Sequence, residues 1–337
     1  MRVLTLALHP TIDRVVRIRE LQPGATFGAE MLMTVPAGKG TNTARTLGCV
    51  WPARRQIVAV SWIGQDERRW YAKRLAEISG IRAVLCARPC FTRFACTLLE
   101  ASGRETHIKE RMPPPSRADE AAFLGFWRRL VRRDDIVALC GSAPEGTSSK
   151  LLREVYIVAR KAGVRALIAD SSGAALELAA AAGLDGLKGN AAEIGAWLGL
   201  GQALDPAKRV SRRALQDVFA RPGAPRAVLC TLGAAGAVLA VPGKLLRAAP
   251  PALSGNAAPS CRRDAGAPRQ PQSATGCGDA ATAGWLWAIL QGCALEETLR
   301  RAVACGTAKL ASPDPGCLDP RYVERLMRKT SIQTVPI

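Results

Sequence analysis

The sequence predicts an α/β protein in which a mostly parallel sheet is covered by helices on both faces. Short β-like runs alternate with longer amphipathic stretches along most of the 337 residues. Such alternation is typical of parallel strands that are joined by crossover helices. Apolar residues make up 48% of the chain and charged residues 22%, which is the balance of a globular protein with a sizeable buried core.

The predicted strands are short apolar runs, and the predicted helices are longer runs with helical periodicity. Strands are expected at residues 3–8, 56–62, 82–86, 94–100, 136–140, 166–169, 186–188, 226–230 and 237–241. Helices are expected at residues 40–48, 67–79, 119–131, 148–162, 174–182, 191–198, 279–291 and 295–312. In a sheet of this kind, ligands bind where the parallel strands end.

Three segments depart from this alternation. Residues near 13–35 and 88–112 alternate more like antiparallel strands and could form a small accessory sheet. Residues 242–274 are rich in Pro, Ala, Ser, Gly and Arg, so we expect an exposed loop there. This loop could be a functional lid, or its composition could reflect a bias without functional consequence.

The net charge of +19 favours anionic partners, which include nucleic acid, anionic membranes and phosphorylated small molecules. A plain composition bias toward arginine would also explain the charge. The basic residues are scattered in pairs with few aromatic residues between them, so we expect no dedicated nucleic-acid surface. The apolar stretch at 280–290 is roughly half of what crosses a bilayer, and we expect no membrane partner.

The eleven cysteines contain no CxxC pair, and no histidine completes a metal site around them. The N-terminal segment reads better as a first strand than as a secretion signal. We therefore expect reduced thiols in a cytoplasmic protein. His9 and His107 are the only histidines, and neither has a partner pattern that favours histidine-dependent catalysis.

The segment Gly276-Cys277-Gly278-Asp279 stands at the start of an apolar helix. Its glycines allow backbone N–H groups to converge, and the positive end of the helix favours an anion such as a phosphate. Asp279 could take a proton from a hydroxyl group. It could equally be an ordinary first-turn acid that complements the helix dipole, and the segment alone leaves both interpretations open.

The segment Gly38-Lys39-Gly40 also precedes a predicted helix and brings backbone donors together with a cation. Asn42 offers both a donor and an acceptor, which suits a pair of sugar hydroxyls. The spacing of a P-loop is absent. A plain glycine-rich turn fits this segment as well.

Two further side chains are single candidates. Asp13 follows the first strand, and a carboxylate there could bind adjacent sugar hydroxyls or simply be a solvated loop acid. Arg93 could hold a phosphate group or lie on the surface.

Two turns that follow predicted strands are further candidates. Asn190 and Glu193 have the spacing of a capping box, which favours a structural interpretation. The glycine-containing turn at 231–236 would let a nucleotide lie close to the backbone, but alone it is a weak signal.

Taken in order, these segments resemble the PfkB, or ribokinase-like, carbohydrate kinase family across nearly the whole chain. The nearest branch holds 1-phosphofructokinase, tagatose-6-phosphate kinase and the minor 6-phosphofructokinase. Each segment is weak alone, but together, in this order and at this spacing, they are hard to obtain by chance. The matching residues are 5–13, 37–42, 92–93, 140–146, 170–173, 188, 190, 193, 231–233 and 276–279.

The resemblance implies a single kinase domain over residues 1–337, folded as a three-layer αβα sandwich with a small β-sheet lid. It implies ATP-dependent phosphoryl transfer to a hexose phosphate with Mg²⁺. Conversion of fructose 1-phosphate to fructose 1,6-bisphosphate is favoured, and 6-phosphofructokinase or tagatose-6-phosphate kinase activity are the alternatives. The lid strands would come from about 13–35 and 88–112, where a homodimer could form.

The resemblance also assigns roles to individual residues. Asp279 would be the general base, and the anion hole would consist of Gly276, Cys277 and Gly278. The substrate would contact Asp13, Gly38, Lys39, Asn42, Arg93 and Ser142. The nucleotide would contact Lys188, Asn190, Thr231, Gly233 and Gly236. Mg²⁺ would be organised through water by Asn190 and Glu193.

Several positions depart from the family pattern. His9 and Gly189 replace an asparagine and a proline that are usual in the family, and Cys277 replaces the usual alanine of the anion hole. These departures motivate an alternative of another class, a catalytically impaired sugar-phosphate-binding protein. A nicotinamide-dependent oxidoreductase is disfavoured because no GxGxxG follows the first strand.

Overall fold

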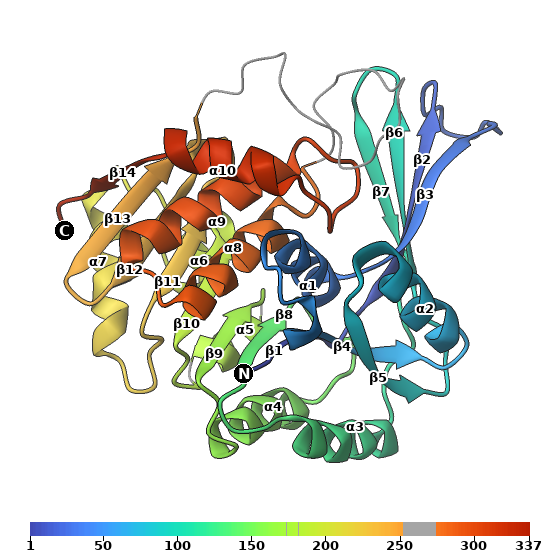
Figure 1. Ribbon diagram of the computed structural model, residues 1–337, viewed down its shortest axis with the longest axis horizontal. Coiled ribbons are helices and arrows are strands. Elements are labelled where there is room, and N and C mark those ends of the chain that lie inside the picture. Colours follow the sequence, from blue (N-terminus) through green and yellow to red (C-terminus); the bar gives the residue numbers. More distant parts are fainter. Residues whose placement is uncertain (173, 181, 252–273) are drawn as a thin grey trace.

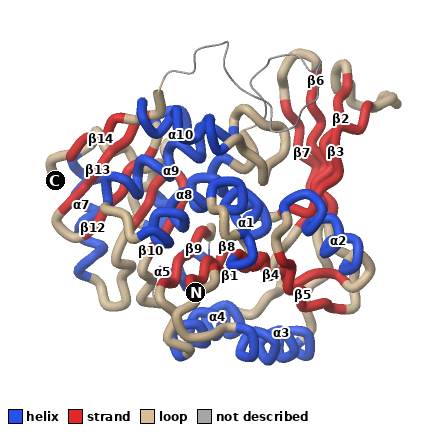
Figure 2. Tube along the Cα trace, viewed as in Figure 1, coloured by secondary structure: helices blue, strands red, loops and turns tan. Residues whose placement is uncertain are grey.

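The computed structural model describes residues 1–172, 174–180, 182–251 and 274–337. These residues form a ten-stranded sheet with helices on both faces and a separate four-stranded sheet (Figure 1). The smaller sheet stands clear of the larger one at the upper right, as the strands drawn in red show (Figure 2). The predicted three-layer α/β fold with a small additional sheet is confirmed.

The larger sheet has the order β14-β13-β12-β11-β10-β9-β8-β1-β4-β5. Every pairing from β11 through β1 to β5 is parallel, so these strands end at one common edge. The parallel strands are β1 Val3–Ala7, β4 Ile57–Gly64, β5 Arg82–Arg88, β8 Ile136–Cys140, β9 Ala166–Asp170, β10 Gly186–Asn190 and β11 Val228–Thr231. The antiparallel strands are β12 Ala237–Val241, β13 Lys244–Ala249 and β14 Ser331–Thr334.

Two apolar cores lie on the two faces of this sheet. All residues of β1 and β4 are buried, as expected for parallel strands that are covered on both sides. One core packs under α3–α7, with Phe123 and Trp127 at its centre. The other packs under α1, α2, α8 and α9 and contains Leu47 and Trp285.

The helices are α1 Lys39–Val50, α2 Arg68–Ser79, α3 Arg117–Leu130, α4 Ser149–Lys161, α5 Ala174–Ala180, α6 Ala191–Trp197, α7 Arg209–Asp217, α8 Cys277–Gln291, α9 Leu295–Lys309 and α10 Pro320–Lys329.

The smaller sheet, called the lid sheet below, has the order β3-β2-β6-β7. Its strands lie within the two segments that the sequence singled out. They are β2 Thr11–Ile18, β3 Glu30–Ala37, β6 Phe94–Glu100 and β7 Glu105–Lys109. The outer pairs are antiparallel, as expected, but β2 and β6 pair in parallel. These two come from separate hairpins, so no tight turn forces them to run in opposite directions.

The predicted loop at 242–274 is partly wrong. Residues Lys244–Ala249 form β13, which pairs with β12 and β14, whereas residues 252–273 lie outside the described part. Leu245, Leu246 and Ala248 of β13 are buried, but the surrounding Pro and Ala content hid that strand. The strand β14 was also missed, because its four residues are mostly exposed and β13 supplies its pairing.

Two further expectations concern the cysteines and the location of the protein. The cysteines with free thiols in the described residues are Cys49, Cys86, Cys90, Cys96, Cys140, Cys230, Cys277, Cys293 and Cys305. Cys317 is disulfide-bonded, so the expectation of reduced thiols throughout is wrong at that position. Among the described residues, no helix has the length and apolar character needed to cross a membrane. Cytoplasmic location stays a prediction.

Candidate active site

One cavity of about 870 Å³ gathers most of the predicted site residues at the common edge of the parallel strands. It lies where β10 and β11 end and where α1 and α8 begin. The predicted residues that line it are Lys39, Lys188, Asn190, Glu193, Thr231, Gly233, Gly236, Gly276, Cys277, Gly278 and Asp279. The sheet topology therefore brings together segments from four separate parts of the sequence.

The turn before α8 requires glycine at position 276. Gly276 has a φ of 89°, and a Cβ there would collide with the carbonyl oxygen of Pro315. A Cβ on Gly278 would lie 2.8 Å from Nζ of Lys188. Because the first N–H groups of a helix have no partner within the helix, they offer a site for an anion. Gly276 to Asp279 line the cavity, so this helix start opens onto it.

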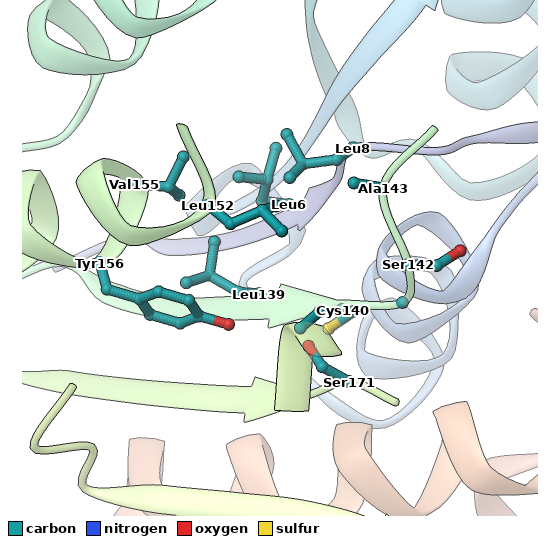
Figure 3. A pocket seen from close by; sticks show the side chains of 12 residues that line it. Leu6, Leu8, Leu139, Cys140, Ser142, Ala143, Leu152, Val155, Tyr156 and Ser171 are labelled. Atoms are coloured by element: carbon teal, nitrogen blue, oxygen red, sulfur yellow. The ribbon is translucent and has the colours of Figure 1, made fainter. Parts of the chain in front are cut away.

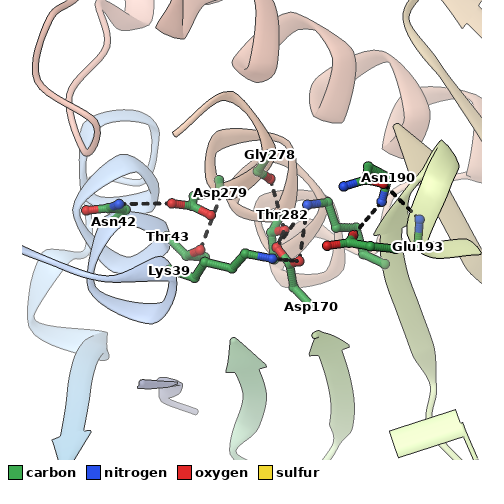
Figure 4. A network of polar contacts seen from close by, with 10 residues as sticks. Lys39, Asn42, Thr43, Asp170, Asn190, Glu193, Gly278, Asp279 and Thr282 are labelled. Atoms are coloured by element: carbon green, nitrogen blue, oxygen red, sulfur yellow. Dashed lines mark hydrogen bonds and ion pairs between the residues drawn. The ribbon is translucent and has the colours of Figure 1, made fainter. Parts of the chain in front are cut away.

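Asp279 is buried in the first turn of α8 and accepts a hydrogen bond from Nδ2 of Asn42 at 2.9 Å (Figure 4). Burial raises the pKa of Asp279 to about 6, and the nearby Asp170 carboxylate adds to the effect. A carboxylate whose pKa lies close to neutral can accept a proton and still be mostly ionised at pH 7. The geometry is therefore suited to proton abstraction.

Asp170 ends β9 at the centre of a buried ionic network that the sequence did not assign to the site. Both carboxylate oxygens lie 3.1 Å from Nζ of Lys188, and Oδ1 lies 3.3 Å from Nζ of Lys39 (Figure 4). Thr282 donates its hydroxyl at 2.7 Å. Burial works to raise the pKa of Asp170, but Lys188 and Lys39 hold it below its usual range. The same Asp170 carboxylate raises the pKa of Lys39.

Asn190 and Glu193 form the capping box that their spacing predicts. Glu193 donates its backbone N–H to Oδ1 of Asn190 at 2.9 Å, and Asn190 donates its own to Oε2 of Glu193 at 2.8 Å. Both side chains also line the cavity. Their structural role at the start of α6 is therefore confirmed, and it leaves both residues beside the space where a ligand would lie.

A second group of predicted residues lies around the connection from β1 to β2. Asp13 accepts a hydrogen bond from the Thr11 hydroxyl at 2.5 Å, and burial raises its pKa. Gly38 has a φ of 103°, and a Cβ there would lie 2.9 Å from the Cα of Pro10. Gly38 directly precedes α1, so this group is joined to the cavity through that helix.

Arg93 and Ser142 belong to the same second group. Arg93 donates from Nη2 to the carbonyl oxygen of His9 at 3.1 Å, and the Ser142 hydroxyl lies 3.4 Å from Nδ1 of His9. Burial, with Arg93 and Arg88, lowers the pKa of His9 to about 3. Its ring is therefore neutral at physiological pH, and the positive charge of the neighbouring arginines favours this neutral form.

Comparison with known proteins identifies the family. The sequence profile described as pfkB family carbohydrate kinase matches residues 28–319. The chain belongs to this family. As a pfkB carbohydrate kinase, the protein is an enzyme that phosphorylates a carbohydrate, and family membership implies ATP as the donor.

The relatives named here align with nearly the whole of this pfkB kinase. A 1-phosphofructokinase from Rhodobacter capsulatus is 30% identical over 345 aligned residues, which cover 100% of this chain and 99% of the relative. One from Vibrio cholerae is 24% identical and covers 99% and 97%. Phosphofructokinase-2 from Escherichia coli superimposes with a TM-score of 0.83 at 21% identity, covering 97% and 98%. A possible 1-phosphofructokinase from Thermotoga maritima gives 0.79 at 18% identity, covering 100% of both chains.

One wall of the kinase cavity was not predicted from the sequence. Side chains of α9 line it, together with two prolines that follow β13. These residues are Ala302, Val303, Gly306, Thr307, Pro250 and Pro251. They carry no catalytic group and form no motif, and only the packing of one face of α9 and the path of the chain after β13 make them part of the site. The apolar wall could accept the flat face of a nucleotide base.

A smaller cavity of about 20 Å³ lies beside Ser142, between β1, β8 and α4 (Figure 3). Apolar side chains such as Leu139 and Val155 surround it, and the Tyr156 and Ser171 hydroxyls face each other there. It has room for about one water molecule. The predicted contact of Ser142 with substrate would therefore have to come from outside this cavity, where Ser142 is exposed.

We expect kcat to fall about tenfold per pH unit below about pH 6, because protonation of Asp279 removes its ability to accept a proton. The Asn42 hydrogen bond lowers the pKa of Asp279, so Asn42→Ala should move this acidic limb to higher pH. The measurement is kcat between pH 5 and 9 at saturating substrates. The phosphate group of the substrate also titrates near this pH, but its pKa does not depend on Asn42. If the acidic limb of the pH profile stays in place in Asn42→Ala, Asp279 is not the group that causes it.

Proposed function

We propose that this kinase transfers the terminal phosphoryl group of ATP to a hydroxyl of a hexose phosphate, with fructose 1-phosphate as the favoured acceptor. The observation that carries the proposal is Asp279, a buried carboxylate with a raised pKa at the N-terminus of a helix that opens onto a large cavity. In this reaction the sugar oxygen bonds to the phosphorus, and the bond between that phosphorus and ADP breaks. The hydroxyl proton passes to Asp279.

The other residues would position the reactants and stabilise charge, which is most of what phosphoryl transfer requires. The N–H groups at Gly276 to Gly278 would bind the phosphoryl oxygens during transfer. Lys39 and Lys188, held in place by Asp170, would add positive charge at the same point. Asn42 would hold Asp279 in the orientation that faces the acceptor hydroxyl.

The donor set around the cavity fits Mg²⁺ that is held mainly by ATP and water. Among the described residues, no group of three or more His, Cys, Asp or Glu side chains could hold a metal alone. Mg²⁺ commonly keeps several water ligands beside the substrate phosphates. The capping bond of Glu193 uses Oε2, and a carboxylate has about four acceptor sites, so Glu193 can still accept bonds from metal-bound water. Mg²⁺ would neutralise charge on the triphosphate.

The phosphorylated acceptor is supported by two observations. The relatives from Rhodobacter capsulatus and Vibrio cholerae carry the name 1-phosphofructokinase. Asp13 lies in β2 and Arg93 directly precedes β6, so a carboxylate and a cation at the base of the lid sheet could hold the hydroxyls and the phosphate of one sugar. Thr231, Gly233 and Gly236 line the cavity together with the apolar wall of α9, and would contact the nucleotide.

A coupled assay of ADP release tests the acceptor. Fructose 1-phosphate, fructose 6-phosphate and tagatose 6-phosphate are compared with free fructose and ribose at equal concentration. We expect the largest kcat/KM for fructose 1-phosphate. Turnover of a free sugar alone would reject the phosphorylated acceptor. Thermal stabilisation by a hexose phosphate without any ADP release would instead indicate a binding protein that has lost catalysis.

We infer that two copies of the chain associate through the lid sheet. This sheet exposes large apolar side chains, among them Met31 at 63% and Ile108 at 57% exposure. Phosphofructokinase-2 from Escherichia coli, a relative in fold, has a tetrameric inhibited form. We expect Met31→Glu to convert a dimer to a monomer in light scattering, whereas Val210→Glu on α7, also an exposed apolar position, should leave it unchanged. A monomeric unmodified protein would reject the inference.

A further inference from the structure

A buried lysine lies behind the catalytic turn, and the proposed mechanism gives it no role. Lys309, the last residue of α9, has an exposed fraction of 0%. Its Nζ donates to the carbonyl oxygen of Ser312 at 2.8 Å. Removing an ammonium group from water is costly unless its surroundings compensate for the lost hydration. An apolar side chain of the same length would fill this space without that penalty. The presence of a lysine at this buried position therefore indicates that its ammonium group has a role.

The turn that Lys309 holds is short and internally bonded. Asp314 donates its backbone N–H to the Ser312 hydroxyl at 3.2 Å, and Gly316 donates its own to Oδ1 of Asp314 at 3.0 Å. A second buried cation holds the turn from α1, because Nη2 of Arg45 lies 2.5 Å from Oδ2 of Asp314. Residues 312–316, called the brace turn below, are therefore clamped between α9 and α1.

The brace turn packs directly behind the anion hole. The carbonyl oxygen of Pro315 occupies the space where a Cβ of Gly276 would lie. Gly276 therefore cannot shift toward the brace turn, and the brace turn cannot move forward without displacing Gly276. α1 carries Asn42, which bonds Asp279, as well as Arg45, which bonds the brace turn. Helix α1 therefore holds the general base directly through Asn42, and it holds the anion hole through Arg45 and the brace turn.

Ionisable groups from several elements lie near the Lys309 ammonium. Cys277 and Asp279 come from α8, Asp314 from the brace turn and Glu105 from β7. Burial lowers the pKa of Lys309, and these groups oppose that effect. A fixed positive charge beside the start of α8 would also strengthen the attraction of that turn for a phosphate.

We propose that Lys309 is a positioning residue, whose ammonium holds residues 312–316 against Gly276 and thereby fixes the N–H groups of the anion hole. The proposal rests on the proposed function of the turn at Gly276 to Asp279. Loss of the ammonium frees the brace turn and lowers the rate of phosphoryl transfer. It leaves binding of the hexose phosphate largely unchanged, because the residues proposed for that sugar lie around β2 and α1.

The kinetic test compares Lys309→Met, which keeps the length and removes the charge, with Lys329→Met at an exposed position of α10. We expect Lys309→Met to lower kcat about 100-fold with KM for the hexose phosphate within about threefold. Lys329→Met should match the unmodified enzyme. In Lys309→Ala, ammonium chloride should restore kcat at least tenfold, whereas tetramethylammonium chloride at the same ionic strength should not. A kcat of Lys309→Met within threefold of the unmodified value overturns the proposal.

Amide hydrogen exchange gives a readout that needs no turnover. In Lys309→Met without ligands, peptides that cover 274–280 and 312–316 should exchange about tenfold faster, with no change in α4. Unchanged exchange in both peptides overturns the proposal. The proposal is also overturned if the loss of kcat is accounted for by a lower melting temperature and ammonium restores none of it. If the unmodified protein turns over no sugar, the proposed function fails. Amide hydrogen exchange in Lys309→Met then still tests whether Lys309 holds the brace turn and the start of α8 in place.

A second variant covers the case in which Lys309→Met does not fold. Asp314→Asn keeps the shape of the brace turn and removes the charge that pairs with Arg45. We expect about a tenfold loss of kcat and faster exchange in the same two peptides. If both quantities stay at their unmodified values, the brace turn does not position the anion hole.

Discussion

Replacing Asp279 with asparagine is expected to lower kcat about a thousandfold while ATP binding stays largely intact. An amide keeps the size of the carboxylate and can still accept the hydrogen bond from Asn42, but it cannot take a proton from the acceptor hydroxyl. The measurement is steady-state ADP release together with calorimetric titration of ATP. Asp217→Asn at the exposed end of α7 is the matched control. A kcat within tenfold of the unmodified value would show that Asp279 is not the base.

The same substitution should not destabilise the protein. The pKa of Asp279 rises from its ordinary value of 3.8 to about 6 in the folded state, which corresponds to about 3 kcal/mol. The folded state favours the protonated form of Asp279. Its contribution to the free energy of unfolding is therefore fully present below pH 3.8 and is lost as pH rises through 6. Asparagine carries no charge to bury, so Asp279→Asn should melt at the same or a higher temperature at pH 8.

Asp170→Ala is expected to lower the free energy of unfolding by about 3–5 kcal/mol. Both side chains of the pair with Lys188 are almost completely buried, so removal of the carboxylate leaves an ammonium group in the interior without its main counter-charge. Thr282 and Lys39 lose the same partner. The measurement is urea denaturation at pH 7.5. A loss below 1 kcal/mol would mean that water reaches Lys188 and that the network is not buried.

Two controls separate the buried charge from general damage. The double variant Asp170→Leu with Lys188→Met replaces the buried pair with apolar groups and should recover most of the lost stability. Glu77→Ala removes a partner of the exposed pair with Lys73 and should change the free energy of unfolding by less than about 0.5 kcal/mol. If the double variant is as unstable as Asp170→Ala, packing rather than charge dominates at this position.

The sequence by itself determined the fold class, the two segments that form the smaller sheet and the glycine-rich turn at the start of α8. Alternating strands and helices are local patterns, and a glycine-rich turn before an apolar helix has the same meaning wherever it lies. Gly276 and Gly38 both have positive φ values, a backbone conformation that glycine adopts without strain. The order of the matching segments was enough to identify the family before their geometry was known. The role of each residue stays a prediction that the experiments above can test.

The tertiary structure alone decided which groups meet. Asp170 ends β9 and lies opposite Lys188 of the neighbouring parallel strand β10, so their pairing follows from the strand order and not from their spacing in the sequence. The wall formed by α9 depends on which face of that helix packs over the sheet edge, and the brace turn joins Lys309 to Arg45 across most of the chain. From its own segment, Asp279 could equally be a proton acceptor or an ordinary first-turn acid. Burial beside Asp170 raised its pKa toward neutrality, because desolvation and like charge act only once the chain has folded.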